Sequence, residues 1–179
     1  MTGTVIFDLE TKRLAADVGG WSNIEKMGFA AGVTYNEVLD EYVRYSENEV
    51  ELLLDTIHRA ELIVGFNLLR FDYVVLRPYG LRVDQSLRRK SLDLLLEIHN
   101  ALGFRLGLGN LAEATLGVSK SADGIQSVQW YREGEIEKIL DYCEQDVRVT
   151  YDLWKYGSQH GHVLYRDRLN RVTRVSVDW

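Results

Sequence analysis

Three short segments of this chain carry side chains that together could hold divalent cations. Asp8 and Glu10 lie in FDLET, Asp72 in GFNLLRFD, and Tyr142 and Asp146 in YCEQD. Positions 8 and 10 would point to the same side of a strand, and positions 142 and 146 would share one face of a helix. Four carboxylates in one cleft would repel one another without cations between them, and oxygen ligands suit Mg²⁺ or Mn²⁺. The sequence therefore predicts a divalent metal site formed by Asp8, Glu10, Asp72 and Asp146.

The residues around the first two acids predict three antiparallel strands. TVIFDLE (4–10) is rich in β-branched and aromatic residues and ends at the acids. Further strands are expected over 29–35 and 38–45, joined by a hairpin turn at Asn36 and Glu37. Asp8 and Glu10 should therefore lie at the end of a central strand.

Asp72 is expected at the start of a helix. A first helix is predicted over 47–60, where Ser46 and Glu49 form a capping box. A short buried strand at 62–67 follows, and the stretch 69–80 then predicts a helix that ends near its proline and glycine. Asp72 would fall in the first turn of that helix.

The last two candidate residues belong to the most clearly periodic segment of the chain. Helices are predicted over 92–102 and 109–116, and a longer one over 133–155, where apolar residues recur every three to four positions. Tyr142 and Asp146 each come one residue before an apolar position of this pattern. Both should therefore flank the buried face of the helix.

Length and composition fit one α/β domain. We expect it to span 1–179, with the motifs in a core at 5–156 and a C-terminal β extension of two strands at 160–179. Cys143 is the only cysteine, which excludes an internal disulfide and favours a reducing compartment. Apolar runs are far shorter than the roughly 20 residues of a membrane helix. A cytoplasmic protein without membrane association is expected.

The net charge of −6 at first argues against a nucleic-acid partner. Two bound Mg²⁺ ions would add about +4 at the acidic site itself, which formal counting ignores. Basic residues also cluster at 87–90 and between Arg166 and Arg174. For any single arginine, a solvated surface position is the simpler interpretation.

Two local patterns have structural explanations that we prefer to functional ones. Asp93 could be a fifth metal ligand, but an aspartate before a helical segment is typical of an N-cap. The glycine-rich stretch 107–112 matches a dinucleotide-binding fingerprint, but no hydrophobic strand leads into it. A loop that caps a helix is expected there.

The order of the motifs resembles the DEDD superfamily of 3′ to 5′ exonucleases. The chain has Asp-x-Glu-Thr on a first strand, Asn-x-x-x-Phe-Asp after a later strand, and Tyr-x-x-x-Asp on a late helix. The tyrosine marks the DEDDy branch, because Asp141 stands where the histidine branch would have its histidine. The spacing is most similar to the proofreading exonuclease domain of family B DNA polymerases and its stand-alone relatives. The segments around Asp93 and at 110–120 are similar as well, so the resemblance covers 5 to about 156.

This resemblance implies a fold and a set of catalytic residues. The fold would be ribonuclease H-like, with a mixed β-sheet flanked by helices. Asp8 would bridge two Mg²⁺ or Mn²⁺ ions, Glu10 and Asp146 would complete the shell of the water-activating ion, and Asp72 would support the second. Tyr142 would orient the attacking water more than deprotonate it, because an unperturbed tyrosine has a pKa of about 10.

The resemblance also implies contacts with the substrate. Thr11 and Asn67 would contact the terminal nucleotide or its backbone, and Leu9 and Phe71 would pack near the last bases. The implied activity is removal of nucleoside 5′-monophosphates from the 3′ end of single-stranded nucleic acid, with DNA as the first expectation. The acidic balance predicts weak binding by the isolated domain, with help from a helicase or polymerase partner.

Two other functions stay open from the sequence. One keeps the fold but cleaves structured nucleic acid internally, as a ribonuclease H-like endonuclease. The other is a non-catalytic nucleic-acid-binding domain. Intact metal ligands argue against the second, because clustered acids without a function destabilise a cleft.

Overall fold

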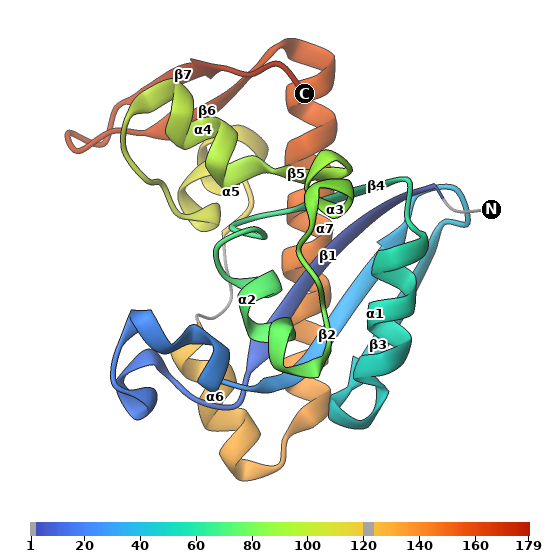
Figure 1. Ribbon diagram of the computed structural model, residues 1–179. Coiled ribbons are helices and arrows are strands. Elements are labelled where there is room, and N and C mark those ends of the chain that lie inside the picture. Colours follow the sequence, from blue (N-terminus) through green and yellow to red (C-terminus); the bar gives the residue numbers. More distant parts are fainter. Residues whose placement is uncertain (1–2, 120–123) are drawn as a thin grey trace.

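A five-stranded mixed sheet forms the centre of the computed structural model, which describes residues 3–119 and 124–179 (Figure 1). The strands lie in the order β3-β2-β1-β4-β5. β1 pairs antiparallel with β2 and parallel with β4, β2 pairs antiparallel with β3, and β5 continues parallel to β4. The strands are Thr4–Thr11, Phe29–Asn36, Glu41–Ser46, Leu62–Gly65 and Ser91–Asp93. The expected mixed sheet with three antiparallel first strands is confirmed.

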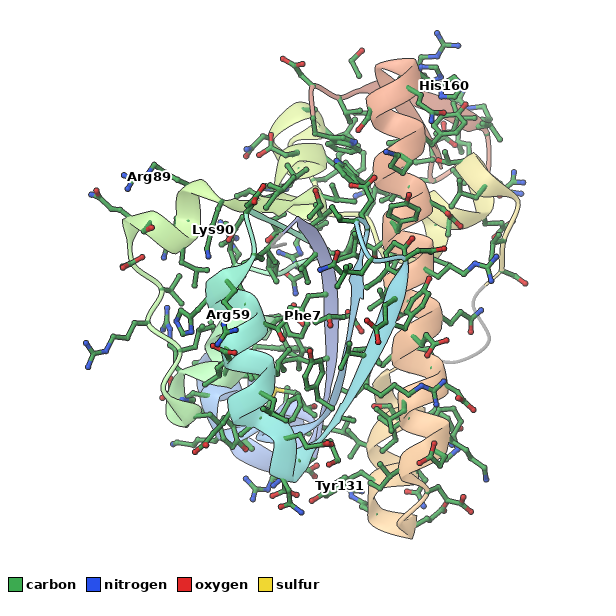
Figure 2. The ribbon with its side chains drawn as sticks, turned by 90° about the vertical axis from the view of Figure 1, so that its right-hand side faces the viewer. Phe7, Arg59, Arg89, Lys90, Tyr131 and His160 are labelled. Carbon is green, nitrogen blue, oxygen red and sulfur yellow. The ribbon has the colours of Figure 1, made fainter. Side chains whose placement is uncertain are left out.

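Helices cover both faces of this sheet, so β1 is buried on both sides. Val5, Phe7 and Leu9 face the core beneath α1 (Val50–Arg59) and α2 (Asp72–Leu76), and Figure 2 shows Phe7 between β1 and α1. Ile6 faces the opposite core, beneath α7 (Ile136–His160). Because side chains alternate along a strand, Asp8 and Glu10 share the α7 side with Ile6.

The turn between β2 and β3 differs from the prediction. Residues 37–40 connect the two strands, instead of Asn36 and Glu37 alone. The side-chain oxygen of Asn36 accepts hydrogen bonds from the backbone N–H groups of Val38 (3.0 Å) and Leu39 (3.1 Å). This local turn ends β2 and delays the start of β3 to Glu41.

Both ends of α1 are fixed by side chains. At its start, the Glu49 carboxylate accepts hydrogen bonds from the backbone N–H (2.9 Å) and hydroxyl (2.7 Å) of Ser46, and the first turn, Glu47–Glu49, is a 3-10 helix. At its end, the Lys90 ammonium donates to the carbonyls of Ile57, His58 and Ala60 at 2.6–3.2 Å. Lys90 of the basic cluster 87–90 therefore has a structural role, whereas Arg89 projects from the surface (Figure 2).

The middle of the chain contains elements that the sequence did not predict. α3 (Gln85–Arg89) and α6 (Gly124–Glu133) were missed, and the predicted helix 92–102 is divided between β5 and α4 (Leu94–Leu102). The apolar run LDLLL fits either a strand or a helix. Residues 91–93 form a strand because they pair with β4. The helix predicted over 69–80 consists of α2 and the 3-10 helix Arg77–Tyr79. Three-residue strands and single-turn helices depend on such tertiary contacts.

Apart from the missed α6, the elements from α5 onward were predicted from the sequence. α5 spans Leu108–Leu116, and Lys120, at the end of the similar segment 110–120, lies outside the described residues. α7 begins and ends a few residues later than the predicted 133–155, and Gly161, whose positive φ of 66° suits a glycine, caps its C-terminal end. β6 (His162–Arg166) and β7 (Val172–Ser176) form the expected antiparallel hairpin. Across residues 3–119 and 124–179, none of the helices combines the length and apolar character needed to span a bilayer.

A tight contact joins the C-terminal residue to α7. The Trp179 indole N–H donates to the carbonyl of Trp154 (3.0 Å), and its ring lies directly over Gly157. A Cβ atom added at position 157 would come within 2.5 Å of this ring. The absence of a side chain at Gly157 therefore allows the indole to close the hairpin onto the helix.

We expect Gly157→Ala to destabilise the protein by about 1–3 kcal/mol, because the indole must move and its hydrogen bond is lost. Thermal unfolding followed by circular dichroism measures the effect. Gly107→Ala is the matched control, since nothing lies within 4 Å of a Cβ atom at that position. Equal melting temperatures for the two variants would contradict the packing role of Gly157.

Candidate metal centre

Three carboxylates meet where β1 passes beneath α7. Ligand oxygens of Asp8, Glu10 and Asp146 all lie within 4.8 Å of one another. Asp8 and Glu10 come from alternate positions of β1, and a register shift between Glu10 and Thr11 ends the regular pairing with β2. Asp146 is buried on α7. The spacing of two in a strand and the position on the late helix thus bring these three predicted ligands together.

Asp72 lines a cleft together with Asp8 and Glu10 but lies outside this group of three. It is the first residue of α2 and is only 3% exposed. Burial raises the pKa of its carboxyl well above the usual range, and the negative charges of Asp93 and Glu10 act in the same direction. Among the described residues, its Oδ1 atom has no hydrogen-bond partner.

These features fit a bound divalent cation. A buried carboxylate oxygen without a partner is costly, and clustered carboxylates repel one another. Hard cations such as Mg²⁺ and Mn²⁺ take oxygen ligands and would remove both penalties. The acidic cluster could therefore bind divalent metal.

Tyr142 lies beside the acids, one helical turn before Asp146. Its side chain is buried and packs edge-on against Trp130, with 6.2 Å between ring centroids. Burial raises the pKa of its hydroxyl above the ordinary value, and the charges of Asp146, Glu10 and Asp8 and a hydrogen bond with Asp146 raise it further. The phenol therefore stays protonated at neutral pH and can orient a polar group without acting as a base.

Two further side chains hold the acids and were not singled out as site residues from the sequence. Ser127 of α6 is fully buried, and its hydroxyl donates a short hydrogen bond to Glu10 Oε2. The Cys143 thiol donates to the backbone carbonyl (3.2 Å) and Oδ2 (3.5 Å) of Asp8. Burial raises the pKa of this thiol, which keeps it a neutral donor. Cys143 is a core residue, as expected, and it also orients Asp8.

Contacts at the far side of α6 fix the helix that carries Ser127. The Tyr131 hydroxyl, labelled in Figure 2, donates to Glu47 (3.0 Å), and Arg132 forms an ion pair with Asp17 (2.6 Å). These partners are far apart in sequence, and α6 has no strong periodic pattern. The sequence therefore carries no signal that could have assigned Ser127 to the site.

Two clefts flank the acids, and Asp8 lines both. The first, which we call the aromatic cleft, has a volume of about 580 Å³ and extends over Glu10, Asp72 and Tyr142. The second, the Asn67 cleft, has a volume of about 410 Å³ and extends over Asp146 and Arg105. The candidate substrate residues divide between them: Leu9, Thr11 and Phe71 line the aromatic cleft, and Asn67 lines the other.

The aromatic cleft contains a residue that the sequence did not reveal. Trp21 lies in the 3-10 helix Trp21–Lys26 and is 70% exposed. Its ring centroid is 6.5 Å from that of Phe71, at an interplanar angle of 58°. Thr11, in contrast, is buried, and its hydroxyl donates to the carbonyl of Arg13 (3.0 Å). The rings of Trp21 and Phe71, and not the Thr11 hydroxyl, therefore offer a ligand contact surface in this cleft.

Asn67 occupies a tight turn that Asp93 holds in place. Its φ is 69°, and its backbone N–H donates to Asp93 Oδ1 (2.9 Å). Asp93 also accepts from the backbone N–H groups of Leu69 (3.0 Å) and Leu96 (3.3 Å), and so caps α4. The N-cap role expected for Asp93 is confirmed. The side-chain oxygen of Asn67 accepts a hydrogen bond from Arg105 (2.9 Å).

The family comparison agrees with the observed fold. A family model of the RNase H superfamily matches residues 5–157. The chain belongs to the RNase H superfamily. Membership of the RNase H superfamily indicates a nuclease-type hydrolase acting on nucleic acid, and such nucleases generally use divalent metals. None of the curated proteins compared with the chain matches it.

We expect Ser127→Ala to weaken Mn²⁺ binding by about tenfold, because Glu10 loses the donor that orients it. Isothermal titration calorimetry with Mn²⁺ measures the change. Ser158→Ala is the control, since that hydroxyl donates to the carbonyl of Trp154 at the far end of α7. Equal Mn²⁺ affinity in the Ser127 variant and the wild type would show that the hydroxyl does not position Glu10.

Proposed function

We propose that this protein is a 3′ to 5′ exonuclease that releases nucleoside 5′-monophosphates from single-stranded nucleic acid, with DNA as the favoured substrate. The observation that carries the proposal is the hydrogen bond between Tyr142 and Asp146 beside Asp8 and Glu10. This pairing of a protonated tyrosine with three clustered acids supports the DEDDy arrangement implied by the motif order.

In this proposal Asp8, Glu10, Asp72 and Asp146 hold two Mg²⁺ or Mn²⁺ ions. When bound, the ions would supply an activated water and stabilise the leaving 3′ oxygen. Ser127 and Cys143 orient Glu10 and Asp8. Tyr142 holds the attacking water through its hydroxyl, and a tyrosine with an ordinary pKa of about 10 is expected to orient the water more than to take its proton.

The aromatic cleft supports the exonucleolytic form of the reaction. Its volume of about 580 Å³ falls within the range of small-ligand sites, so one nucleotide can fill it. Trp21 and Phe71 offer faces on which a base can stack without regard to sequence. Leu9 and Thr11 also line this cleft. The cleft therefore suits the 3′-terminal nucleotide.

We expect the wild-type protein with Mn²⁺ to shorten a 5′-labelled single-stranded DNA oligomer one nucleotide at a time. Asp8→Ala should lower the rate by about a thousandfold, because one of the carboxylates that would hold the ions is lost. A chelator should abolish cleavage. Denaturing gels resolve the products. A few discrete internal cuts would instead indicate an endonuclease, and an intact oligomer together with Mn²⁺ binding would favour a non-catalytic binding domain.

The aromatic cleft gives a second expectation. Trp21→Ala should raise KM for single-stranded DNA by about tenfold, because stacking on one aromatic side chain contributes roughly 1–3 kcal/mol. Leu52→Ala, at an exposed position of α1, is the control. Steady-state kinetics separates KM from kcat. An unchanged KM in the Trp21 variant would show that the terminal base does not stack in the aromatic cleft.

A further inference from the structure

A third hollow continues the Asn67 cleft toward the C-terminal hairpin. It has a volume of about 600 Å³ and shares Arg105 and Leu106 with the Asn67 cleft. Its remaining walls come from Phe104, Asn110 and the hairpin residues 165–169 and 171. We call it the hairpin groove. Asp8 joins the aromatic cleft to the Asn67 cleft, and Arg105 joins the Asn67 cleft to the hairpin groove.

The hairpin groove is rich in arginine, although the chain as a whole has a net charge of −6. Arg105, Arg166, Arg168 and Arg171 line it, with Asp167 as the one acid of the lining. Arg166 is paired with Glu113 (3.2 Å) and Arg171 with Asp167 (2.7 Å), and Arg168 forms no ion pair with any described residue. Surface ion pairs contribute little, so a phosphate can compete for these guanidinium groups.

Exposed apolar side chains accompany the arginines. Phe104 is 44% exposed, and its ring meets Tyr165 edge-on at 6.1 Å between centroids. Leu169, at the hairpin turn, is 72% exposed. A cationic groove with an exposed aromatic ring is the combination by which proteins bind single-stranded nucleic acid without sequence preference.

The groove has firm walls because α5 holds β6 through two side chains. Asn110 donates to the carbonyl of Arg166 (3.0 Å) and accepts from its backbone N–H (2.9 Å). Thr115 makes the same pair of bonds with Leu164 (2.8 and 2.9 Å). The hairpin lies beside α5, at the end of the molecule away from α6 (Figure 1), and outside the matched residues 5–157.

We propose that the hairpin groove binds the single-stranded segment on the 5′ side of the bond that is cleaved. This inference rests on the proposed function. With the 3′-terminal nucleotide in the aromatic cleft, the strand passes the acids at Asp8 and crosses Arg105 onto the hairpin. Arg105 and Arg168 bind its phosphates, and a base stacks on Phe104.

The test is fluorescence anisotropy with 5′-labelled DNA of three and of roughly 12 nucleotides, a length within the range of single-strand sites. Ca²⁺ replaces Mg²⁺, and a 3′-terminal phosphorothioate linkage slows cleavage. Arg168→Glu and Phe104→Ala should each raise Kd for the longer oligomer by about three- to tenfold and leave the trinucleotide unchanged. Arg168→Glu should also lower the slope of log Kd against log salt by about one.

Arg89→Glu is the matched control, because this arginine projects from α3 on the side of the molecule away from α5 (Figure 2). It makes the same change of charge and should leave both Kd values unchanged. Equal effects of the Arg89 and Arg168 variants on Kd, or effects that do not depend on oligomer length, would contradict the proposal that the hairpin groove binds the strand. So would a wild-type protein that binds neither oligomer.

Parallel cleavage assays separate this inference from the proposed function. A one-nucleotide ladder that requires Asp8, together with unchanged Kd in the Arg168 and Phe104 variants, would support the exonuclease activity and contradict the binding role of the hairpin groove. Length-dependent binding that those variants weaken, without any cleavage by the wild type, would support the binding role of the groove and contradict the exonuclease activity.

Discussion

Repulsion among acids in a buried position is the constraint around which this fold is arranged. Asp8 and Glu10 occupy the side of β1 that packs under α7, where Ile6 is part of the core, and α7 adds Asp146 to the same place. Donors from three side chains, Ser127, Tyr142 and Cys143, surround these carboxylates. Hydrogen bonds offset part of the desolvation, and divalent cations would offset the remaining charge. The site is therefore an unfavourable arrangement of charge that a bound divalent metal ion would stabilise.

The local placement of charge reconciles an acidic protein with a polyanionic substrate. Three acids gather where cations would neutralise them, whereas four arginines line the hairpin groove. Lys90, although it belongs to a basic cluster in the sequence, uses its ammonium group to end α1. Net charge is thus a poor guide to binding here, because position decides which charges face a ligand.

Local patterns in the sequence predicted the parts of the site that depend on local geometry. The spacing of Asp8 and Glu10 follows from a strand, and that of Tyr142 and Asp146 follows from a helix, so these placements could be predicted. Ser127 contacts Glu10 from an element 117 positions away, and Trp21 belongs to a short 3-10 helix without periodic pattern. Such contacts exist only through tertiary packing. β5 was missed for the same reason, since pairing with β4 creates it.

The order of the elements along the chain has a consequence for synthesis in the cell. β1 (Thr4–Thr11), with two of the acids, leaves the ribosome well before α7 (Ile136–His160), with Tyr142 and Asp146. A nascent or prematurely ended chain therefore carries Asp8 and Glu10 without the helix that completes their surroundings. The cluster of carboxylates is assembled only when the core has closed over β1, so fragments left by interrupted translation lack it.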